Sequence, residues 1–182
     1  MVESLSEQRI LRISIIGCGH VGLVTGACFY EIGHEVICTD RDEVRIDGLI
    51  RGELPIYEPG LESLVARNVA AGRLTFTAEA GEAVRFGDTI FICVGTPPLL
   101  NGEAVLSALD SVAREIGLES RSSKLIVEKS TVPLQTGGML LRALTAYGRK
   151  TGHKYHEPLT PSFSGQAQPF GISCILTASS SE

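Results

Sequence analysis

Gly17-Cys18-Gly19-His20-Val21-Gly22 is the stretch that decides the fold of this 182-residue chain, because of what stands on either side of it. An apolar run, Ile13–Ile16, precedes it, and the sequence predicts a helix over Val21–Ile32 after it. A second apolar run, Glu35–Thr39, ends on Asp40, 23 positions after the first glycine. A strand, a glycine turn, a helix, and a strand that ends on an acid are together typical of a dinucleotide-binding unit.

Each glycine of this stretch has a separate physical task. Gly17 allows the tight turn off the strand, and Gly22 lets the helix pack close to the sheet. Gly19 has no Cβ, so a pyrophosphate can approach the backbone. The start of the helix offers the phosphates free N–H groups and the positive end of its dipole. The alternative is a glycine turn that only joins packed elements and binds no ligand.

Asp40 sets the expected cofactor. Its carboxylate can accept hydrogen bonds from both hydroxyls of an adenosine ribose, and it would repel a 2′-phosphate, so NAD is favoured over NADP. Arg41 weakens this preference, because an arginine at this place can accept a 2′-phosphate. The alternative is that Asp40 caps the helix that follows.

The composition excludes several classes of protein. Net charge is −5 with acids and bases interspersed, which does not suit a general nucleic-acid surface. No apolar run approaches the roughly 20 residues that span a bilayer, and Met1–Arg9 is polar, without a signal-peptide core. The 5 cysteines form no CxxC pair, and the histidines form no metal-ligand spacing. We expect buried thiols, no metal, and a reducing compartment, the cytoplasm.

The order of the predicted elements indicates an α/β fold. Apolar strands alternate with helices, and we predict a Rossmann-type, doubly wound, mostly parallel sheet with helices on both faces over residues 10–154. Residues 1–9 are expected to be a disordered tail. The ligand of such a sheet lies beyond the carboxyl ends of its strands. The elements are expected at Arg12–Ile16, Val21–Ile32, Glu35–Thr39, Glu43–Arg51, Leu61–Ala71, Leu74–Thr77, Ala80–Arg85, Thr89–Val94, Val105–Gly117, Leu125–Val127 and Gln135–Tyr147.

Several motifs together resemble the UDP-glucose/GDP-mannose dehydrogenase family over roughly residues 10–150. The element Tyr57-Glu58-Pro59-Gly60-Leu61 is the most specific of them, since other Rossmann dehydrogenases lack it. The others are the glycine stretch with Ile15–Gly26 around it, Arg73–Thr77, Phe91–Pro97 and Val127–Pro133. Within the family, the likeness favours the enzymes that act on UDP-glucose.

The resemblance implies an enzyme that oxidises the C6 alcohol of a nucleotide-bound sugar to a carboxylate, using two NAD. It implies that the backbone of Gly17, Cys18, Gly19, His20, Val21 and Gly22 holds the pyrophosphate. It places Arg45 beside Asp40 at the adenosine ribose. By the same likeness, Thr131 helps to position a water near the reacting carbon. The remaining cofactor residues that the resemblance implies are Val94, Gly95, Thr96, Pro97 and Ser130.

Simpler interpretations of these residues stay open. Arg45 could be a solvated helix residue, and Thr96 could be a turn residue before Pro97. Ser130-Thr131 could be a plain turn at the end of a strand. We assign no chemistry to Tyr57-Glu58-Pro59-Gly60, because two of its residues shape a turn and its acid stands near a helix start.

One departure from the family bears on activity. The resemblance implies a cysteine nucleophile in a glycine-rich segment far downstream, with partner lysine and aspartate residues. This chain does not contain that segment, nor the second domain that builds most of the sugar-nucleotide site. Cys18 lies in the phosphate turn and Cys93 in a strand, so neither is a substitute. We expect the NAD-binding portion of a nucleotide-sugar dehydrogenase, which as this isolated chain is inactive and does not form the family's oligomer. The alternative is a dinucleotide-binding module with no catalysis of its own, or an inactive fragment.

The last residues, 155–182, do not match the family pattern. The family's Asn-Pro-Glu-Phe-Leu element is expected near residue 160, where Leu159-Thr160-Pro161-Ser162-Phe163-Ser164 stands instead. The observed residues can be encoded by codons such as CTA ACC CCG AGT TTC TCC. Read one base earlier after a T, they encode Ser-Asn-Pro-Glu-Phe-Leu. We therefore predict a disordered tail that is translated out of frame.

Overall fold

The structure, a computed structural model, describes residues 9–95, 107–130, 136–156 and 174–180. Side chains are described up to Tyr155. The elements, in chain order, are β1 (Arg12–Ile16), α1 (His20–Glu31), β2 (Glu35–Thr39), α2 (Glu43–Ile50), α3 (Leu61–Ala70), β3 (Leu74–Thr77), α4 (Ala80–Phe86), β4 (Thr89–Ile92), α5 (Ser107–Glu119), β5 (Lys124–Glu128), α6 (Thr136–Gly148), β6 (His153–His156) and β7 (Cys174–Ser180).

Seven strands form one sheet in the order β3-β2-β1-β4-β5-β7-β6. The first five run parallel, and the order moves outward from β1 in both directions, as a doubly wound sheet requires. Parallel strands buried on both faces explain the nearly continuous apolar runs in β1 and β4. The predicted mostly parallel α/β sheet is confirmed.

Strands β6 and β7 correct the sequence analysis. Strand β7 pairs antiparallel with β5, in a register that sets Ile126 opposite Leu176, and β6 pairs antiparallel with β7. The sequence predicts no regular structure after residue 154, and this is wrong for residues 155–156 and 174–180. The end of this chain has no clear period of two residues. The N–H and C=O groups at the edge of β5 offer a template for pairing, and β7 pairs with them although its own sequence has no strand pattern.

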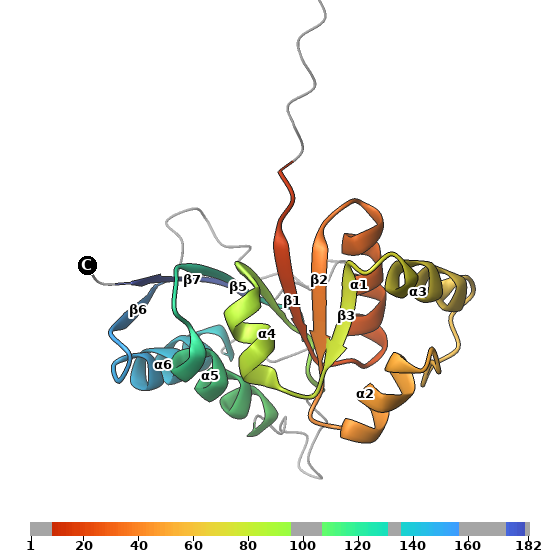
Figure 1. The fold of residues 1–182 in the computed structure, drawn as a ribbon. Coiled ribbons are helices and arrows are strands. Elements are labelled where there is room, and N and C mark those ends of the chain that lie inside the picture. The colour runs from red at the N-terminus through yellow and green to blue at the C-terminus, as the bar shows by residue number, and fades with distance from the viewer. Residues whose placement is uncertain (1–8, 96–106, 131–135, 157–173, 181–182) are drawn as a thin grey trace, which may run out of the picture.

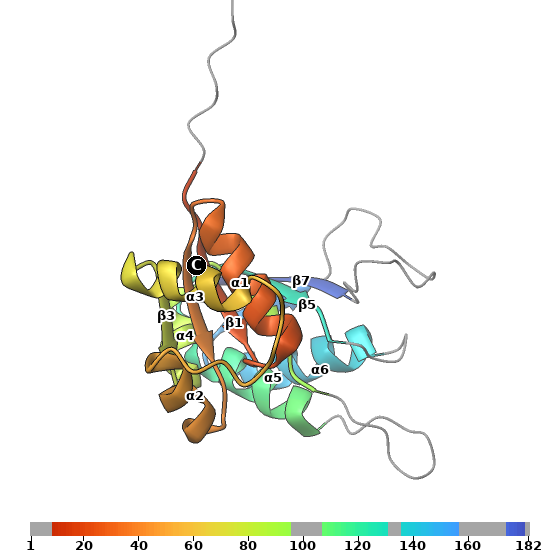
Figure 2. The same cartoon turned by 90° about the vertical axis from the view of Figure 1, so that its right-hand side faces the viewer.

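Two layers of helices cover the sheet, one on each face. Helix α4 lies in front of the sheet in Figure 1, whereas α1 and α3 lie behind it, and Figure 2 shows the same arrangement from the side. One buried cluster joins α1, α2 and α3 to the sheet through residues such as Leu23, Leu49 and Val65. The other joins α4, α5 and α6 to the opposite face through Val84, Ile116 and Leu144.

The carboxyl ends of the parallel strands lie at one edge, the lower edge of Figure 1, where α1, α2 and α5 begin. The predicted bounds differ from the observed ones by one or two residues, apart from those that fall outside the described residues. Helix ends fray, so differences of this size change no conclusion. Within the described residues, no helix is long and apolar enough to cross a membrane.

Candidate functional site

The turn after β1 is held by the ends of two neighbouring strands. The N–H of Gly17 donates a 2.8 Å hydrogen bond to the carbonyl oxygen of Thr39, at the end of β2. The φ of Gly17 is +108°, and a Cβ there would lie 2.6 Å from the carbonyl oxygen of Cys93. Both facts require glycine at this position. The turn is therefore built into the sheet.

Gly22 and Gly19 are glycines for opposite reasons. A Cβ on Gly22 would lie 1.8 Å from the carbonyl oxygen of Gly17, so this glycine allows α1 to approach the turn closely. A Cβ on Gly19 would meet nothing within 4 Å. Packing does not require glycine there, which leaves the space in front of the backbone open for a ligand. Gly19 is also the N-cap residue of α1 and caps it with no side chain, so the first N–H groups of the helix face this space.

Asp40 connects the glycine turn to the next helix. Its Oδ2 accepts hydrogen bonds from the backbone N–H of Cys18, at 2.8 Å, and from the guanidinium of Arg45, at 2.9 Å. Its Oδ1 accepts one from the N–H of Asp42, at 3.0 Å. The cap of α2 is Asp42, whose carboxylate accepts from the N–H of Arg45. The alternative in which Asp40 caps that helix is therefore excluded.

The same contacts exclude the alternative for Arg45. Its side chain lies between the carboxylates of Asp40 and Asp42, the second at 3.6 Å, and is not simply solvated. A carboxylate has about four acceptor positions, and Asp40 uses three of them within the protein. Among the described residues, no further donor occupies Oδ1, so one acceptor position is open to a ribose hydroxyl, whereas the sequence predicts hydrogen bonds from both hydroxyls.

A hollow of about 480 Å³ opens beside the glycine turn, at the carboxyl edge of the sheet. This volume lies within the range of small-molecule sites. Gly17, Gly19, Asp40 and Arg45 line it, together with Arg41. The structure therefore brings the expected pyrophosphate and ribose residues together around one space. The other residues that line it are Ile16, Thr39, Ala78, Ala80, Cys93, Val94, Gly95, Ala108, Ser111, Val112 and Glu115.

The sequence analysis missed the far wall of this hollow. That wall comes from the start of α4 and from α5, including Ser111 and Glu115. The α5 segment has an amphipathic pattern, and such a pattern says which face of a helix is buried. It does not say which end of the helix reaches the carboxyl edge of the sheet, because that depends on how the helix packs.

The residues expected on the nicotinamide side are only partly described. Val94 and Gly95 follow β4 and line the hollow. Ser130 follows β5 and is buried, and its hydroxyl donates a 3.4 Å hydrogen bond to the carbonyl oxygen of Ile92. It does not line the hollow. Thr96, Pro97 and Thr131 lie outside the described residues.

Glu128, at the end of β5, is a buried carboxyl that the sequence analysis did not single out. Its Oε1 accepts a 3.1 Å hydrogen bond from the N–H of Ser130, and among the described residues its Oε2 has no hydrogen-bond partner. Burial raises the pKa of Glu128 to about 7, because the charged form loses its hydration. The signal was an acid at the end of an otherwise apolar strand.

Two of the described cysteines, Cys38 and Cys93, are poor nucleophiles. Cys18 and Cys38 are buried beside each other, and the hydrogen bond with the Cys18 thiol and then burial raise the pKa of Cys38 well above its ordinary value. Burial raises the pKa of Cys93 to about 12. A thiol that keeps its proton does not attack a carbonyl. Cys28 is exposed, on α1. Within the described residues, no group of three or more side chains could hold a metal ion.

The segment between α2 and α3 carries an acid to the glycine turn. The Oε2 of Glu58 lies 3.5 Å from the Nε2 of His20, the first residue of α1. Neither residue lines the hollow itself. The pair therefore stands beside the candidate phosphate position and outside the wall of the hollow.

Comparison with known proteins gives this geometry a family. The sequence model of the UDP-glucose/GDP-mannose dehydrogenase family, NAD binding domain, matches residues 11–166. The chain belongs to the UDP-glucose/GDP-mannose dehydrogenase family. The match passes the expected boundary at residue 154, and it identifies this fold as the family's NAD-binding domain. The cofactor of the domain is NAD.

Relatives in this family cover most of the chain. A UDP-glucose 6-dehydrogenase of Rhizobium meliloti is 47% identical over 135 residues, which is 74% of this chain and 31% of the relative. UDP-glucose 6-dehydrogenase TuaD of Bacillus subtilis is 45% identical over 84% of this chain and 33% of its own length. The chain thus spans about a third of the length of these curated relatives.

Solved structures agree with the family. A ternary complex of GDP-mannose dehydrogenase from Pseudomonas aeruginosa superposes with a TM-score of 0.74 at 37% identity, covering 82% of this chain and 36% of that one. A UDP-glucose dehydrogenase from Pyrobaculum islandicum gives a TM-score of 0.75 at 32% identity, covering 92% and 38%. The residues around the hollow fit NAD, because Gly19 leaves the phosphate position open and Asp40 keeps one acceptor position free.

Proposed function

We propose that this chain is the NAD-binding portion of a UDP-glucose 6-dehydrogenase, which oxidises UDP-glucose to UDP-glucuronate with two NAD. The observation that carries the proposal is the open space at Gly19, in front of an uncapped helix start and beside the Asp40–Arg45 pair. Curated UDP-glucose 6-dehydrogenases are 41% to 48% identical to the chain, whereas GDP-mannose 6-dehydrogenases are 36% to 38% identical. This difference supports UDP-glucose as the sugar nucleotide.

The residues of the turn would hold the two halves of the cofactor in different ways. The first N–H groups of α1, at His20, Val21 and Gly22, would donate to the pyrophosphate. The free acceptor position on Asp40 would take a ribose hydroxyl, and Arg45 would keep that carboxylate ionised and in place. When bound, NAD accepts the hydride of the reaction. We place Val94 and Gly95 toward the nicotinamide, with Thr96, Pro97 and Ser130, and Thr131 at the reacting water.

We also propose that this polypeptide binds NAD without catalysing the oxidation. The buried thiols of Cys38 and Cys93 have a raised pKa and keep their protons, so neither can hold an aldehyde, and Cys18 is buried within the glycine turn. Buried thiols suit a reducing compartment, and we place the protein in the cytoplasm.

Two measurements on the purified chain test these statements. Isothermal titration calorimetry with NAD is expected to give a saturable heat, and a folded chain that gives none would contradict the proposal. Absorbance at the NADH band, with NAD and UDP-glucose present, is expected to stay flat. Steady NADH formation that depends on UDP-glucose would show that a nucleophile is present after all.

The origin of residues 155–182 stays a prediction that the nucleotide sequence tests. If the tail is out of frame, the frame one base earlier continues into a segment like the family's second domain. If that frame meets an early stop codon, the prediction is wrong. Strand β7 does not decide between the two, since an apolar run can pair with the edge of β5 whatever its origin.

A further inference from the structure

The segment from Leu54 to Leu61, to which the sequence analysis assigned no chemistry, holds Glu58 in a defined place. Leu54 and Ile56 pack against the core cluster of α1 and α3, and Leu61 is buried in it. The N–H of Leu61 donates a 3.0 Å hydrogen bond to the carbonyl oxygen of Glu58, and Gly60 has a φ of +85° at the start of α3. The segment is thus anchored on both sides of Glu58, and Tyr57 points into solvent.

The anchored segment holds the carboxylate of Glu58 near the start of α1, where a negative charge opposes the binding of an anionic ligand. Glu58 contacts His20 at 3.5 Å, and His20 is the first residue of the helix whose N–H groups face the open space at Gly19. The carboxylate is therefore about one histidine side chain away from the start of the helix. This separation does not exceed the Debye length, which is about 8 Å at 0.15 M salt. Glu58 alone would repel a pyrophosphate there.

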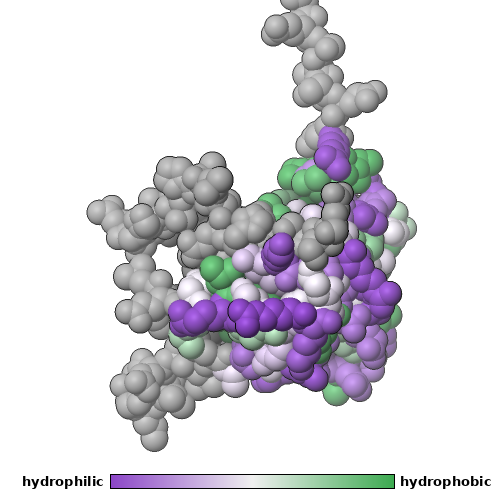
Figure 3. All heavy atoms as spheres, turned by 90° about the vertical axis from the view of Figure 1, so that its left-hand side faces the viewer, coloured by the Kyte–Doolittle hydropathy of each residue, from purple (hydrophilic) through white to green (hydrophobic). Residues whose placement is uncertain are grey.

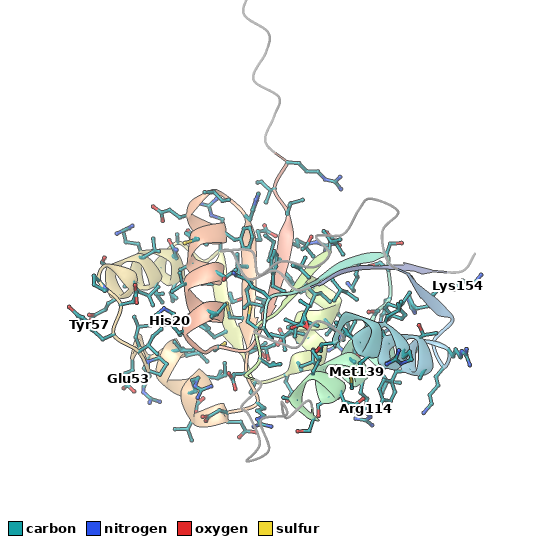
Figure 4. All side chains as sticks on the ribbon, turned by 180° about the vertical axis from the view of Figure 1, so that it is seen from behind. His20, Glu53, Tyr57, Arg114, Met139 and Lys154 are labelled. Carbon is teal, nitrogen blue, oxygen red and sulfur yellow. The ribbon has the colours of Figure 1, made fainter. Side chains whose placement is uncertain are left out.

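His20 is placed to remove this repulsion. Its imidazole lies between the carboxylate and the helix start, and it is the kind of side chain that changes charge between pH 5 and 8. Figure 4 shows His20, Tyr57 and Glu53 on one side of the molecule and Met139 and Arg114 on the other. The side that carries β6, seen in Figure 3, is mostly hydrophilic.

We propose that His20 is a positioning and shielding residue of the pyrophosphate site: its imidazole, held by Glu58, takes up a proton when the dinucleotide binds and cancels the charge of that carboxylate. This inference rests on the proposed NAD binding and adds a role for the Tyr57–Leu61 motif. Among the described residues, the charged group that contacts His20 is Glu58, and the Asp40–Arg45 pair lies on the same glycine turn through the hydrogen bond from the Cys18 N–H to Asp40.

The first consequence concerns pH. NAD is expected to bind more tightly at pH 6 than at pH 8, by roughly two- to fivefold, the effect of one charge near an exposed helix start. At both pH values, His20→Asn should bind NAD no more tightly than the wild type does at pH 8, because no side chain charge then shields Glu58. His20→Lys keeps a permanent charge and should bind at both pH values as the wild type does at pH 6.

The second consequence concerns the pair. Adding Glu58→Gln to His20→Asn removes the repelling carboxylate, so the double variant should recover the affinity that the single variant lost. Glu53→Gln is the matched control, because Glu53 directly precedes this segment and forms an exposed ion pair of 2.9 Å with Arg51. It should recover nothing. Adenosine, which has no phosphate, should bind all of these variants equally.

The assay is calorimetry of the full chain with NAD and with adenosine at pH 6 and pH 8, after circular dichroism has shown that each variant is folded. Equal NAD affinities for wild type and His20→Asn at both pH values would overturn the inference and leave the proposed function intact. An equal loss of adenosine and NAD affinity would show a structural role instead. No NAD binding by the folded wild type would overturn the proposed function itself.

Discussion

Replacing Glu128 by Gln changes the pH dependence of stability, because this carboxyl is buried and burial raises its pKa. The side chain has no exposed surface, and its hydrogen bonds with Ser130 only partly offset the effect of burial, which raises its pKa from 4.5 to about 7. Because the pKa is raised in the folded state, the folded protein holds this proton more tightly than the unfolded chain. The stabilisation is full below pH 4.5 and is lost as pH rises through 7.

The magnitude follows from the shift. A difference of about 2.5 pKa units, at 1.36 kcal/mol for each unit, corresponds to about 3 kcal/mol of the free energy of unfolding. This amount is a large part of the 5–15 kcal/mol that is usual for a domain. Glutamine has nearly the same shape and does not titrate. Part of this contribution is already lost at pH 5, so between pH 5 and pH 8 the stability of the wild type should fall by about 2.5 kcal/mol relative to Glu128→Gln.

Urea unfolding, followed by circular dichroism at pH 5, 6, 7 and 8, measures this difference. Burying the glutamine amide changes the free energy of unfolding by the same amount at every pH, so it does not affect the comparison across pH. Glu53→Gln serves as the control, because Glu53 is exposed and Arg51 lowers its pKa, so it stays ionised over the whole range. Stability curves for wild type and Glu128→Gln that run parallel from pH 5 to pH 8 would refute the reasoning.

The remaining predictions concern the turn, the acid and the thiols. The free energy of unfolding of Gly19→Ala should lie within about 0.5 kcal/mol of the wild-type value, since the added Cβ enters open space, but calorimetry should show NAD binding weakened more than tenfold. Gly22→Ala should instead lose about 2 kcal/mol or more of the free energy of unfolding, because its Cβ would lie 1.8 Å from the carbonyl oxygen of Gly17. Equal losses of stability would contradict this. Asp40→Asn, which keeps an acceptor for the Cys18 N–H, should weaken NAD binding roughly tenfold with a smaller effect on NADP; unchanged NAD affinity would remove the ribose role. A thiol reagent should label Cys28 in the folded protein and the buried thiols only in urea.

The glycine turn was predictable because its requirements are local. Gly17 needs a positive φ and Gly22 needs a close approach, and both needs follow from the change from strand to helix within a few residues. The parallel core was predictable for a similar reason, since apolar strands separated by helices allow few other arrangements. The tail was not predictable, because β7 takes its partner from the edge of β5 and not from its own pattern.

The sequence by itself determined the strand–turn–helix unit, the acid at the end of β2 and the family. The tertiary structure decided the rest of the site. Only packing brings Ser111 and Glu115 of α5 to the hollow and turns Asp40 into a link between the Cys18 N–H and Arg45. The contact of Glu58 with His20 joins residues 38 positions apart. Burial and contacts between distant segments depend on how the elements pack, and no local pattern in the chain encodes them.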